Sequence, residues 1–375
     1  MASNLDAMPS HAEEKIYQIA LSILPHIGVV NARRLMAHMG SARQIFHSSP
    51  STLQRIPHIG PVLAQAVHAS GILTDAEEIW FACQKEGIQV LFYTDADFPN
   101  RLKQIYDAPL VLYWQGSVDL NAEQILAVVG TRKATEYGKQ VCKIIVRDAA
   151  AQQVLFVSGL AYGIDICMHQ NCLDYHVPNI AVLAGGFQWI YPPKHRRFVD
   201  KIRQHGGILS EHPLHQKPDA RFFPLRNRII AGMSDATIVV EAAERGGALI
   251  TADYANNYHR EVFAVPGNLE KIFSEGCNLL IQKHKASIFT NWDHLCEELN
   301  WNAGDAISRN KGLNWDRFTG EESALLALLH QKGELPLDEL AWKLQKNMSE
   351  LAMLVLNLEF QGMIKSLPGH RYALK

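Results

Sequence analysis

Five short apolar runs between residues 125 and 268 constrain the fold of this chain more than any other feature. They read ILAVVGTRK from residue 125, VLFVSGLAYGID from 154, NIAVLAGG from 179, ATIVVEAAERGG from 236 and EVFAVPGN from 261. Each run is rich in Val, Ile, Leu and Ala, ends in small residues or glycine, and precedes a helical pattern. Strands of this kind suit a parallel sheet covered on both faces. The pattern therefore predicts an α/β fold with a doubly wound, mainly parallel sheet.

The length of 375 residues is too great for one ordinary core, so two or three domains are expected. Residues 1–74 carry helical patterns, residues 82–298 hold the α/β core, and residues 313–375 carry three helical patterns before a Pro-Gly turn. Three helices followed by a hairpin are typical of a winged helix. The polar, aperiodic segment WNAGDAISRNKGLN, residues 301–314, indicates a linker before this last domain.

The N-terminal helical segment contains an internal repeat. Pro25-His26-Ile27-Gly28 recurs as Pro57-His58-Ile59-Gly60, and an amphipathic helical pattern follows each copy. Helix, tight turn and helix suggest a helix-hairpin-helix or SAM-like domain, in which hairpin amides hold a phosphate. His26 and His58 stand where that pattern usually has a glycine, and the charges of residues 1–74 nearly balance. A packing role is therefore favoured, although a DNA contact stays open.

The C-terminal segment carries little positive charge where a DNA-reading helix needs it. Such a helix exposes Arg, Lys, Asn or Gln to the bases. Residues 349–361 contain no Lys or Arg, and their only charged residues are Glu350 and Glu359. This favours a protein-contact module over a reader of double-stranded DNA.

The overall composition narrows the possible functions. The chain has 36 Lys and Arg against 38 Asp and Glu, so a nucleic-acid surface must be local. Six cysteines occur without a Cys-x-x-Cys pair, which favours buried reduced thiols over a metal site. The N-terminal sequence shows neither a signal peptide nor a membrane span. We expect a soluble cytoplasmic protein without a metal.

The turn after the first strand is suited to an anion. Gly130 allows a sharp turn, and the free amides at the following helix start attract negative charge. The sequence from Gly130 through Thr131 and Arg132 is neither G-x-G-x-x-G nor a Walker A loop. Neither a nicotinamide cofactor nor ATP is expected, and we predict no cofactor.

Two further turns add candidate residues. Ser158 and Gly159 begin the second turn, and Asp165 and His169 follow four residues apart on one helical face. A general acid and base would need a nucleophile or metal nearby, so a locally bonded first-turn acid is favoured. In the fourth unit, Gly247 precedes another anion-ready helix start.

A strongly basic stretch lies between residues 194 and 228. It holds nine Lys and Arg against three acids, including Lys194, Arg197 and the run Arg226-Asn227-Arg228. Tyr191, Phe198 and Phe222 are interleaved with these cations. Single-stranded nucleic acid needs cations along its backbone and aromatic faces for its bases. The alternative interpretation of each aromatic is a core residue, and the sequence leaves the two open.

These motifs together resemble one family. VVGTRKATEYG, SGLAYGIDICMH, YPPKHRRF, SEHP, FPLRNRIIAG, VVEAAERGGALITA and FAVPGN are similar, in order and spacing, to the DNA-processing protein A family (DprA, also called Smf). The resemblance implies a Rossmann-like core and a protein that is not an enzyme. It also implies binding and protection of incoming single-stranded DNA in natural transformation, help in loading RecA recombinase, and a homodimer through the core.

The resemblance also implies a set of DNA-binding residues. Arg132 and Lys194 match family residues that contact the DNA backbone. The lining of the same pocket is matched by Ser158, Gly159, Arg226, Asn227 and Arg228. With Gly130, Thr131, Arg197 and Gly247 from the turns and the basic stretch, these form the predicted DNA-binding site. The chain departs from the family's Ser-Gly-Ser at residues 246–248, which removes a hydroxyl that could bond phosphate.

The main alternative is a nucleotide hydrolase of the phosphoribohydrolase type, which has a similar sheet. Those enzymes show P-G-G-x-G-T-x-x-E with a catalytic Glu. Here ERGGALITA lacks the Thr-x-x-Glu continuation, and Glu241 and Glu244 precede the glycines. The sequence therefore favours a binding protein, and no catalytic residue is predicted.

Overall fold

A computed structural model describes residues 10–301, 318, 320–344, 346–361, 363–367 and 371–374. The chain divides into two compact units, Met1–Leu299 and Asn300–Lys375. Most of the predicted linker, and residues 368–370 of the predicted Pro-Gly turn, lie outside the described residues. Among the helices described, none combines the length and apolar character needed to cross a membrane.

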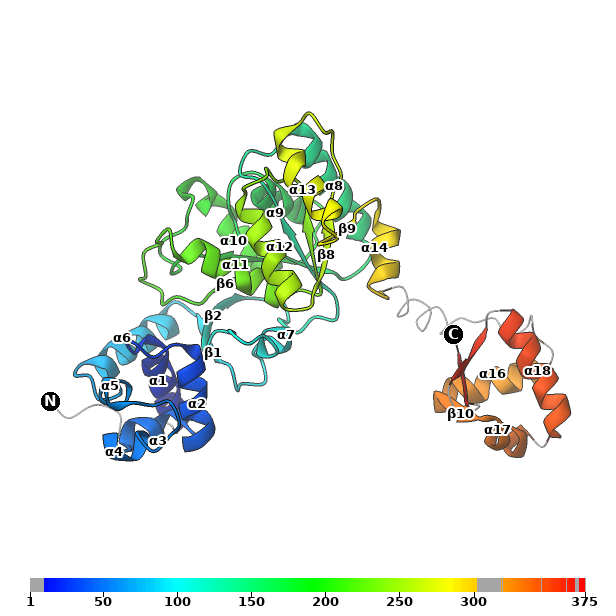
Figure 1. Ribbon diagram of the computed structural model, residues 1–375, viewed down its shortest axis with the longest axis horizontal. Coiled ribbons are helices and arrows are strands. Elements are labelled where there is room, and N and C mark those ends of the chain that lie inside the picture. The colour runs from blue at the N-terminus through cyan, green and yellow to red at the C-terminus, as the bar shows by residue number, and fades with distance from the viewer. Residues whose placement is uncertain are drawn as a thin grey trace. The chain divides into compact units, whose positions relative to one another are not determined.

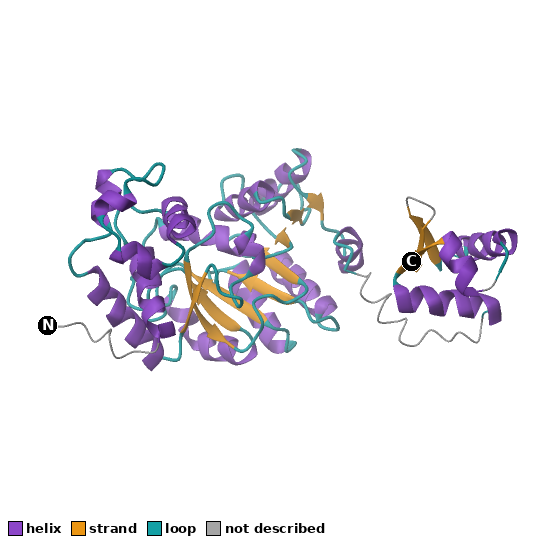
Figure 2. Ribbon diagram, turned by 90° about the horizontal axis from the view of Figure 1, so that it is seen from below, coloured by secondary structure: helices purple, strands orange, loops and turns teal. Residues whose placement is uncertain are grey.

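The first unit is built around a twisted sheet of nine strands in its described residues (Figures 1 and 2). The spatial order is β1 (Gln89–Phe92), β2 (Val111–Gly116), β6 (Gly207–Ser210), β5 (Asn179–Leu183), β4 (Leu155–Ser158), β3 (Ile125–Val129), β7 (Ala236–Val239), β8 (Glu261–Ala264) and β9 (Ser287–Ile288). The strands from β6 to β9 are parallel, whereas β2 runs antiparallel to both β6 and β1. The mainly parallel sheet expected from the apolar runs is confirmed.

The order of the strands places a topological switch between β3 and β7. From β3 the chain winds outward through β4 and β5 to β6, then crosses back to β7 and winds the other way. Loops at the carboxyl ends of β3 and β7 therefore diverge and leave a crevice between them. In open α/β sheets this is where ligands bind.

Helices cover both faces of the sheet. Alternate residues of β5 show this, since Ile180 and Val182 pack into one hydrophobic cluster and Ala181 and Leu183 into another. One layer contains α8 (Glu136–Ala149), α9 (Ile164–Asp174) and α10 (Arg196–His205), and the other contains α7 (Asn100–Lys103), α11 (Phe222–Gly232) and α12 (Gly247–Asn257). The short η2 (Pro193–His195), α13 (Ile272–Gln282) and α14 (Trp292–Glu298) complete the core.

The N-terminal helices pack on the antiparallel edge of the same sheet. They are α1 (Ser10–Ile23), α2 (Val29–Met39), α3 (Ala42–His47), α4 (Pro50–Leu53), α5 (Pro61–Ala66) and α6 (Ile72–Lys85). Val90 and Phe92 of β1 point into the cluster of these helices, whereas Leu91 points into the cluster of the α/β core. An ion pair between Lys15 and Asp95 joins the two parts. One face of the edge strands β1 and β2 is therefore part of the hydrophobic core of the helical segment.

The repeated Pro-His-Ile-Gly segments form two similar turns. His26 and His58 adopt left-handed backbone conformations with φ of 65° and 67°. Ile27 and Ile59 are buried, and the glycine that follows each precedes α2 or α5. The left-handed geometry explains why a glycine is usual at the two histidine positions. The repeat is thus a repeat of structure, and its role in DNA contact stays a hypothesis.

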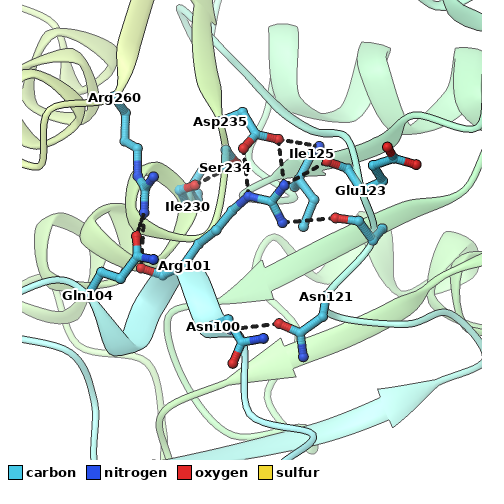
Figure 3. Close-up of polar contacts among 11 residues, drawn as sticks. Asn100, Arg101, Gln104, Asn121, Glu123, Ile125, Ile230, Ser234, Asp235 and Arg260 are labelled. Carbon is cyan, nitrogen blue, oxygen red and sulfur yellow. Dashed lines mark hydrogen bonds and ion pairs between the residues drawn. The ribbon is translucent and has the colours of Figure 1, made fainter. Parts of the chain in front are cut away.

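An ionic clamp holds the amino ends of the switch strands (Figure 3). The Arg101 guanidinium donates to both carboxylate oxygens of Asp235 at 2.7 and 2.9 Å, and to the carbonyl oxygens of Ala122 and Glu123. The same Asp235 carboxylate accepts from the Ile125 amide at 2.9 Å. Because Ile125 begins β3 and Asp235 precedes β7, the clamp fixes the two strands whose opposite ends border the crevice.

The second unit contains three helices and a small antiparallel sheet. Its elements are α16 (Gly320–Lys332), β10 (Glu334–Pro336), α17 (Leu337–Leu344), α18 (Met348–Phe360), β11 (Ile364–Leu367) and β12 (Arg371–Leu374), with strand order β10-β12-β11. Leu326, Leu340, Leu351 and Leu358 are among its buried residues. The arrangement confirms the predicted winged helix.

Candidate functional site

A cavity of about 1030 Å³ opens at the carboxyl edge of the sheet, at the switch between β3 and β7. The turn after β3, the loop after β7 and the first turns of α11 and α12 form its walls, and the segments around Ala161, Tyr191 and Phe273 complete it. Its place follows from the strand order, because both walls begin where the chain leaves the sheet in opposite directions.

Glu241 fixes the turn after β3. Its buried carboxylate accepts from the Thr135 amide at 2.9 Å and from the Thr135 hydroxyl, and its backbone oxygen accepts from the Thr131 amide at 2.7 Å. Thr135 in turn caps α8 by accepting from the Gly138 amide. A residue of the loop after β7 therefore holds both ends of the turn after β3, so this acid has a positioning role.

Glycines allow this turn to lie close to α9. A Cβ at Gly130 would lie 2.4 Å from Ile164 Cγ1, so the backbone can pass only without a side chain. Gly163 has a φ of 79°, and a Cβ there would lie 2.1 Å from the Thr131 carbonyl oxygen. The Ile164 amide donates to that same oxygen at 3.1 Å. The first and second turns are therefore one packed unit.

The cavity is electropositive. Arg132, Lys133 and Arg245 line it with exposed side chains, and Arg226 lines it from a buried position. Asp165 is the one acid among its lining residues. Four cations against one carboxylate in a concave space attract a polyanion more strongly than the nearly neutral whole chain does.

Arg226 is tied down within the site. It donates to the carbonyl oxygen of Gly159 at 2.6 Å and to that of Val182, and its Nε donates to the Asn227 side chain at 3.1 Å. Burial lowers the pKa of Arg226 to about 10, and the charge of Asp165 opposes this shift. Burial raises the pKa of Asp165, which Arg226 partly offsets. Since its Nε and Nη1 donors already have partners, Arg226 forms the floor that supports the exposed cations.

The spacing of Asp165 and His169 has a structural explanation. Asp165 accepts from the Ala161 amide at 3.4 Å and interacts with Arg226. The Nδ1 of His169 bonds to the side-chain oxygen of Asn179 at 2.7 Å, and burial lowers the pKa of His169 to about 4. These separate partners agree with the locally bonded acid that the sequence favoured.

Aromatic side chains line one wall. Tyr191 is 46 % exposed and meets the edge of the Phe223 ring, with ring centroids 5.4 Å apart. The Arg132 guanidinium lies over the same Phe223 ring at 5.6 Å. Of the other aromatics considered from sequence, Phe198 packs partly into the core beneath Arg197, and Phe222 lies tilted against His212 with ring centroids 4.1 Å apart. Tyr191 and Phe223 are thus the two rings that this wall offers to a base.

The structure brings about half of the sequence-predicted residues to the cavity. The lining includes Gly130, Thr131, Arg132, Arg226, Asn227 and Gly247. Beneath it, Ser158 is buried with its hydroxyl donating to the Val128 carbonyl at 2.6 Å, and Gly159 supplies a carbonyl to Arg226. Lys194 and Arg197 are exposed on η2 and α10 and do not line the cavity. Lys194 follows Tyr191, a lining residue, by three positions.

Arg228 lies away from the cavity. Its guanidinium bonds to the Glu211 carboxylate at 2.5 and 2.6 Å and to the Asp107 carbonyl at 2.7 Å. Its side chain is 7 % exposed. Arg226 and Arg228 are two positions apart on α11, so they point in different directions. In this structure Arg228 ties α11 to the loops around it.

Sequence reasoning missed several lining residues. Lys133, Phe223, Arg245 and Phe273 line the cavity but were not among the predicted site residues. Lys133 and Arg245 adjoin predicted turn residues and carry the same charge, so the turns themselves contained this signal. Phe223 is next to Phe222, and only the orientation of α11 distinguishes the two. Phe273 lies on α13, outside the basic stretch.

Comparisons with known proteins agree with this architecture. The DNA recombination-mediator protein A family matches residues 89–300, and the DprA winged helix domain matches residues 318–370. The chain belongs to the DNA recombination-mediator protein A family. Family members similar to it include the DNA processing protein DprA of Bacillus subtilis, which is 36% identical over 67% of this chain and 87% of its own length. Protein Smf of Escherichia coli is 35% identical over 74% of this chain and 76% of its own.

Two solved structures of family members are similar in fold. The X-ray structure of DprA from Streptococcus pneumoniae has a TM-score of 0.63 at 28% identity, covering 76% of this chain and 95% of that one. DprA from Helicobacter pylori has a TM-score of 0.52 at 29% identity, covering 58% and 96%. The work on the latter describes its single-stranded DNA binding mode.

Proposed function

We propose that this protein binds single-stranded DNA in the switch-point cavity without cutting it, as a recombination mediator of natural transformation. On this proposal it protects incoming DNA, helps to load RecA recombinase, and works in the cytoplasm as a homodimer through the core. The observation that carries the proposal is the cavity, where three exposed cations stand beside two accessible rings. The Helicobacter pylori relative, described as binding single-stranded DNA, supports it.

An unpaired strand suits this combination of groups. Its phosphates follow one another along a flexible backbone, and its bases are free to stack on aromatic rings. Arg132 serves both purposes, because its exposed guanidinium can reach a phosphate and also lies over the Phe223 ring. We include Lys194 as a further phosphate contact just outside the cavity, where the chain continues from Tyr191.

The two buried carboxylates at the cavity, those of Asp165 and Glu241, support a binding role rather than hydrolysis. Asp165 is buried against Arg226, and Glu241 is held by Thr135. A general base must reach the proton that it removes. Both acids instead hold the walls in place.

Binding to a fluorescent oligonucleotide tests the proposal. We expect Arg132→Ala to weaken binding about tenfold for the loss of one charge-assisted contact worth about 1.5 kcal/mol. The matched control is Arg147→Ala, which removes an exposed arginine of α8 that is paired with Asp148 and does not line the cavity. Equal affinity of wild type and Arg132→Ala, or equal losses in both variants, would remove the cavity as the DNA site.

The mediator role needs its own experiment. RecA filament growth is measured on single-stranded DNA coated with a single-strand-binding protein, with wild type or Arg132→Ala added. We expect faster filament growth only with the wild type. Normal DNA binding without any acceleration would leave the binding site standing and refute the loading role.

A further inference from the structure

Two cysteines far apart in sequence meet between α8 and α9. Cys142 of α8 and Cys167 of α9 interact where these two helices pack against each other. The Cys167 thiol also lies 3.9 Å from the carbonyl oxygen of Lys139, which is one turn before Cys142 on α8. Cys142 is buried and Cys167 is partly exposed, and both are free thiols.

A glycine on α8 brings the two helices close together at this point. A Cβ at Gly138 would lie 2.2 Å from Glu241 Oε2 and 3.0 Å from Ile164 Cδ1, so the glycine makes room first for the Glu241 carboxylate and also lets Ile164 of α9 pack tightly against α8. Cys142 is one turn after Gly138, and Cys167 is about one turn after Ile164. Residues one turn apart share a helix face, so the close crossing continues directly into the thiol pair.

The surroundings of Cys167 differ from those of the other cysteines. The hydrogen bond from Cys142, the charge of Lys139 and a bond from the Asn171 amide lower the pKa of Cys167, although partial burial opposes them. Burial raises the pKa of Cys83 and of Cys277 to about 12. A lowered pKa, partial exposure and a neighbouring thiol together characterise redox-sensitive cysteines.

We propose that Cys167 and Cys142 form a peroxide-sensitive modification site that closes to an intramolecular disulfide between α8 and α9. The Cys167 thiolate attacks hydrogen peroxide, the O–O bond breaks, and a sulfenic acid and hydroxide result. The Cys142 sulfur then attacks the Cys167 sulfur, an S–S bond forms, and the Cys167 hydroxyl leaves as water with the Cys142 proton. The two thiols are oxidised and one peroxide is reduced. A dithiol reductant reverses the step.

The disulfide would link the helices that follow the first two turns of the cavity. α8 begins after the turn containing Arg132, and α9 begins at Ile164, which bonds to that turn. The proposal of a disulfide is argued only from the contacts of Cys142 and Cys167, so it does not depend on DNA binding.

The test treats the full-length protein with hydrogen peroxide at neutral pH, blocks remaining thiols, and maps peptides without reduction. We expect a Cys142–Cys167 cross-linked peptide in the wild type, which dithiothreitol releases. Cys172→Ala, one turn further along α9, is the control and should keep the cross-link. Cys142→Ala should lose it but accumulate a Cys167 sulfenic acid that dimedone traps. Absence of the cross-link in the wild type, or a different cysteine pair in it, overturns the proposal.

A second measurement keeps the proposal testable even if the alanine variants unfold. Native wild-type protein is alkylated with iodoacetamide, and each cysteine is followed by mass spectrometry. We expect Cys167 to react faster than Cys83 and Cys277, because its pKa is lowered whereas burial raises theirs to about 12, and the thiolate is the reactive form. Reaction of Cys167 at the same rate as the buried cysteines would contradict the proposal.

Discussion

The salt dependence of DNA binding can distinguish the exposed cations of the cavity, which we expect to contact phosphates, from the buried Arg226, which we expect not to. Arg132, Lys133 and Arg245 are exposed in the lining, and we add Lys194 as a fourth phosphate contact. For a single strand each contact contributes about −0.7 to the slope of log K against log salt, so the wild type should show about −2.8. Between about 50 and 200 mM salt its affinity should then fall about 50-fold.

Replacing Arg132 by Gln removes one contact from this set. The slope should become about −2.1, so the same rise in salt should lower the affinity only about 18-fold. The protein should keep its stability, because the contact of Arg132 with Phe223 is an exposed cation–π pair worth about 0.5–1 kcal/mol.

Arg226→Gln should behave in the opposite way. Arg226 is 5 % exposed and already bonds to Gly159 and Val182, so its loss should leave Asp165 buried without its cation. Losing these charge-assisted hydrogen bonds, together with the nearby charge that favours ionised Asp165, should cost about 3 kcal/mol. In a unit of this size that lowers the melting temperature by about 6–12 °C. The salt slope of the protein that remains folded should stay near that of the wild type.

Fluorescence anisotropy at four or more salt concentrations gives the slopes, and thermal unfolding followed by circular dichroism gives the stability. Arg132→Gln should change the salt slope and keep the stability, whereas Arg226→Gln should lower the stability and keep the salt slope. An unchanged slope in Arg132→Gln would show that this side chain does not meet a phosphate. A lowered slope in Arg226→Gln at full stability would show that the buried cation is released to contact the strand.

Three further predictions concern positioning and stability. Glu241→Gln should weaken oligonucleotide binding several-fold in anisotropy titrations, because an amide NH₂ facing the Thr135 amide disturbs the turn at a cost of about 1–3 kcal/mol; unchanged affinity would contradict its positioning role. Arg101→Ala and Asp235→Ala should each lower the free energy of unfolding by about 3 kcal/mol, and the double variant by less than their sum; additive losses in urea unfolding would show that the two do not interact. His169, with a folded pKa of about 4, stays neutral while the unfolded chain takes up a proton, so stability should fall as pH drops from about 6.5 to about 4, by up to about 3 kcal/mol. Asp165, whose pKa is raised, opposes this fall, and His169→Gln should show a smaller decrease with pH than the wild type.

Local sequence patterns were enough to predict the sheet and the place of the cavity. Apolar runs ending in glycine mark β3, β4, β5 and β7, and the residues that follow them form the walls. The prediction works because a parallel strand covered on both faces must be apolar on both. The turn that follows it must also contain small residues where another part of the backbone passes close by. The second condition is visible at Gly130, which has Ile164 against it.

The directions of individual cations could not be predicted in the same way. Arg226, Asn227 and Arg228 are adjacent in sequence, but the helix turns them apart. Arg226 reaches the cavity floor, whereas Arg228 reaches Glu211. Glu211 comes directly after β6 and is far from Arg228 in the sequence. The direction of a buried charged side chain is set by the group that it bonds to. That partner can be identified only once the positions of the strands are known.

The division between buried and exposed charged groups explains how the cavity holds its exposed cations in fixed positions. Its buried side chains are held mainly by backbone atoms, since Arg226 donates to the Gly159 and Val182 carbonyls and Glu241 accepts from the Thr135 amide and hydroxyl. The exposed cations stand on backbone segments that these bonds hold, so they require no partner of their own before a ligand arrives. Binding of a strand then costs little reorganisation of the protein, because the turns that present Arg132 and Arg245 are already in position.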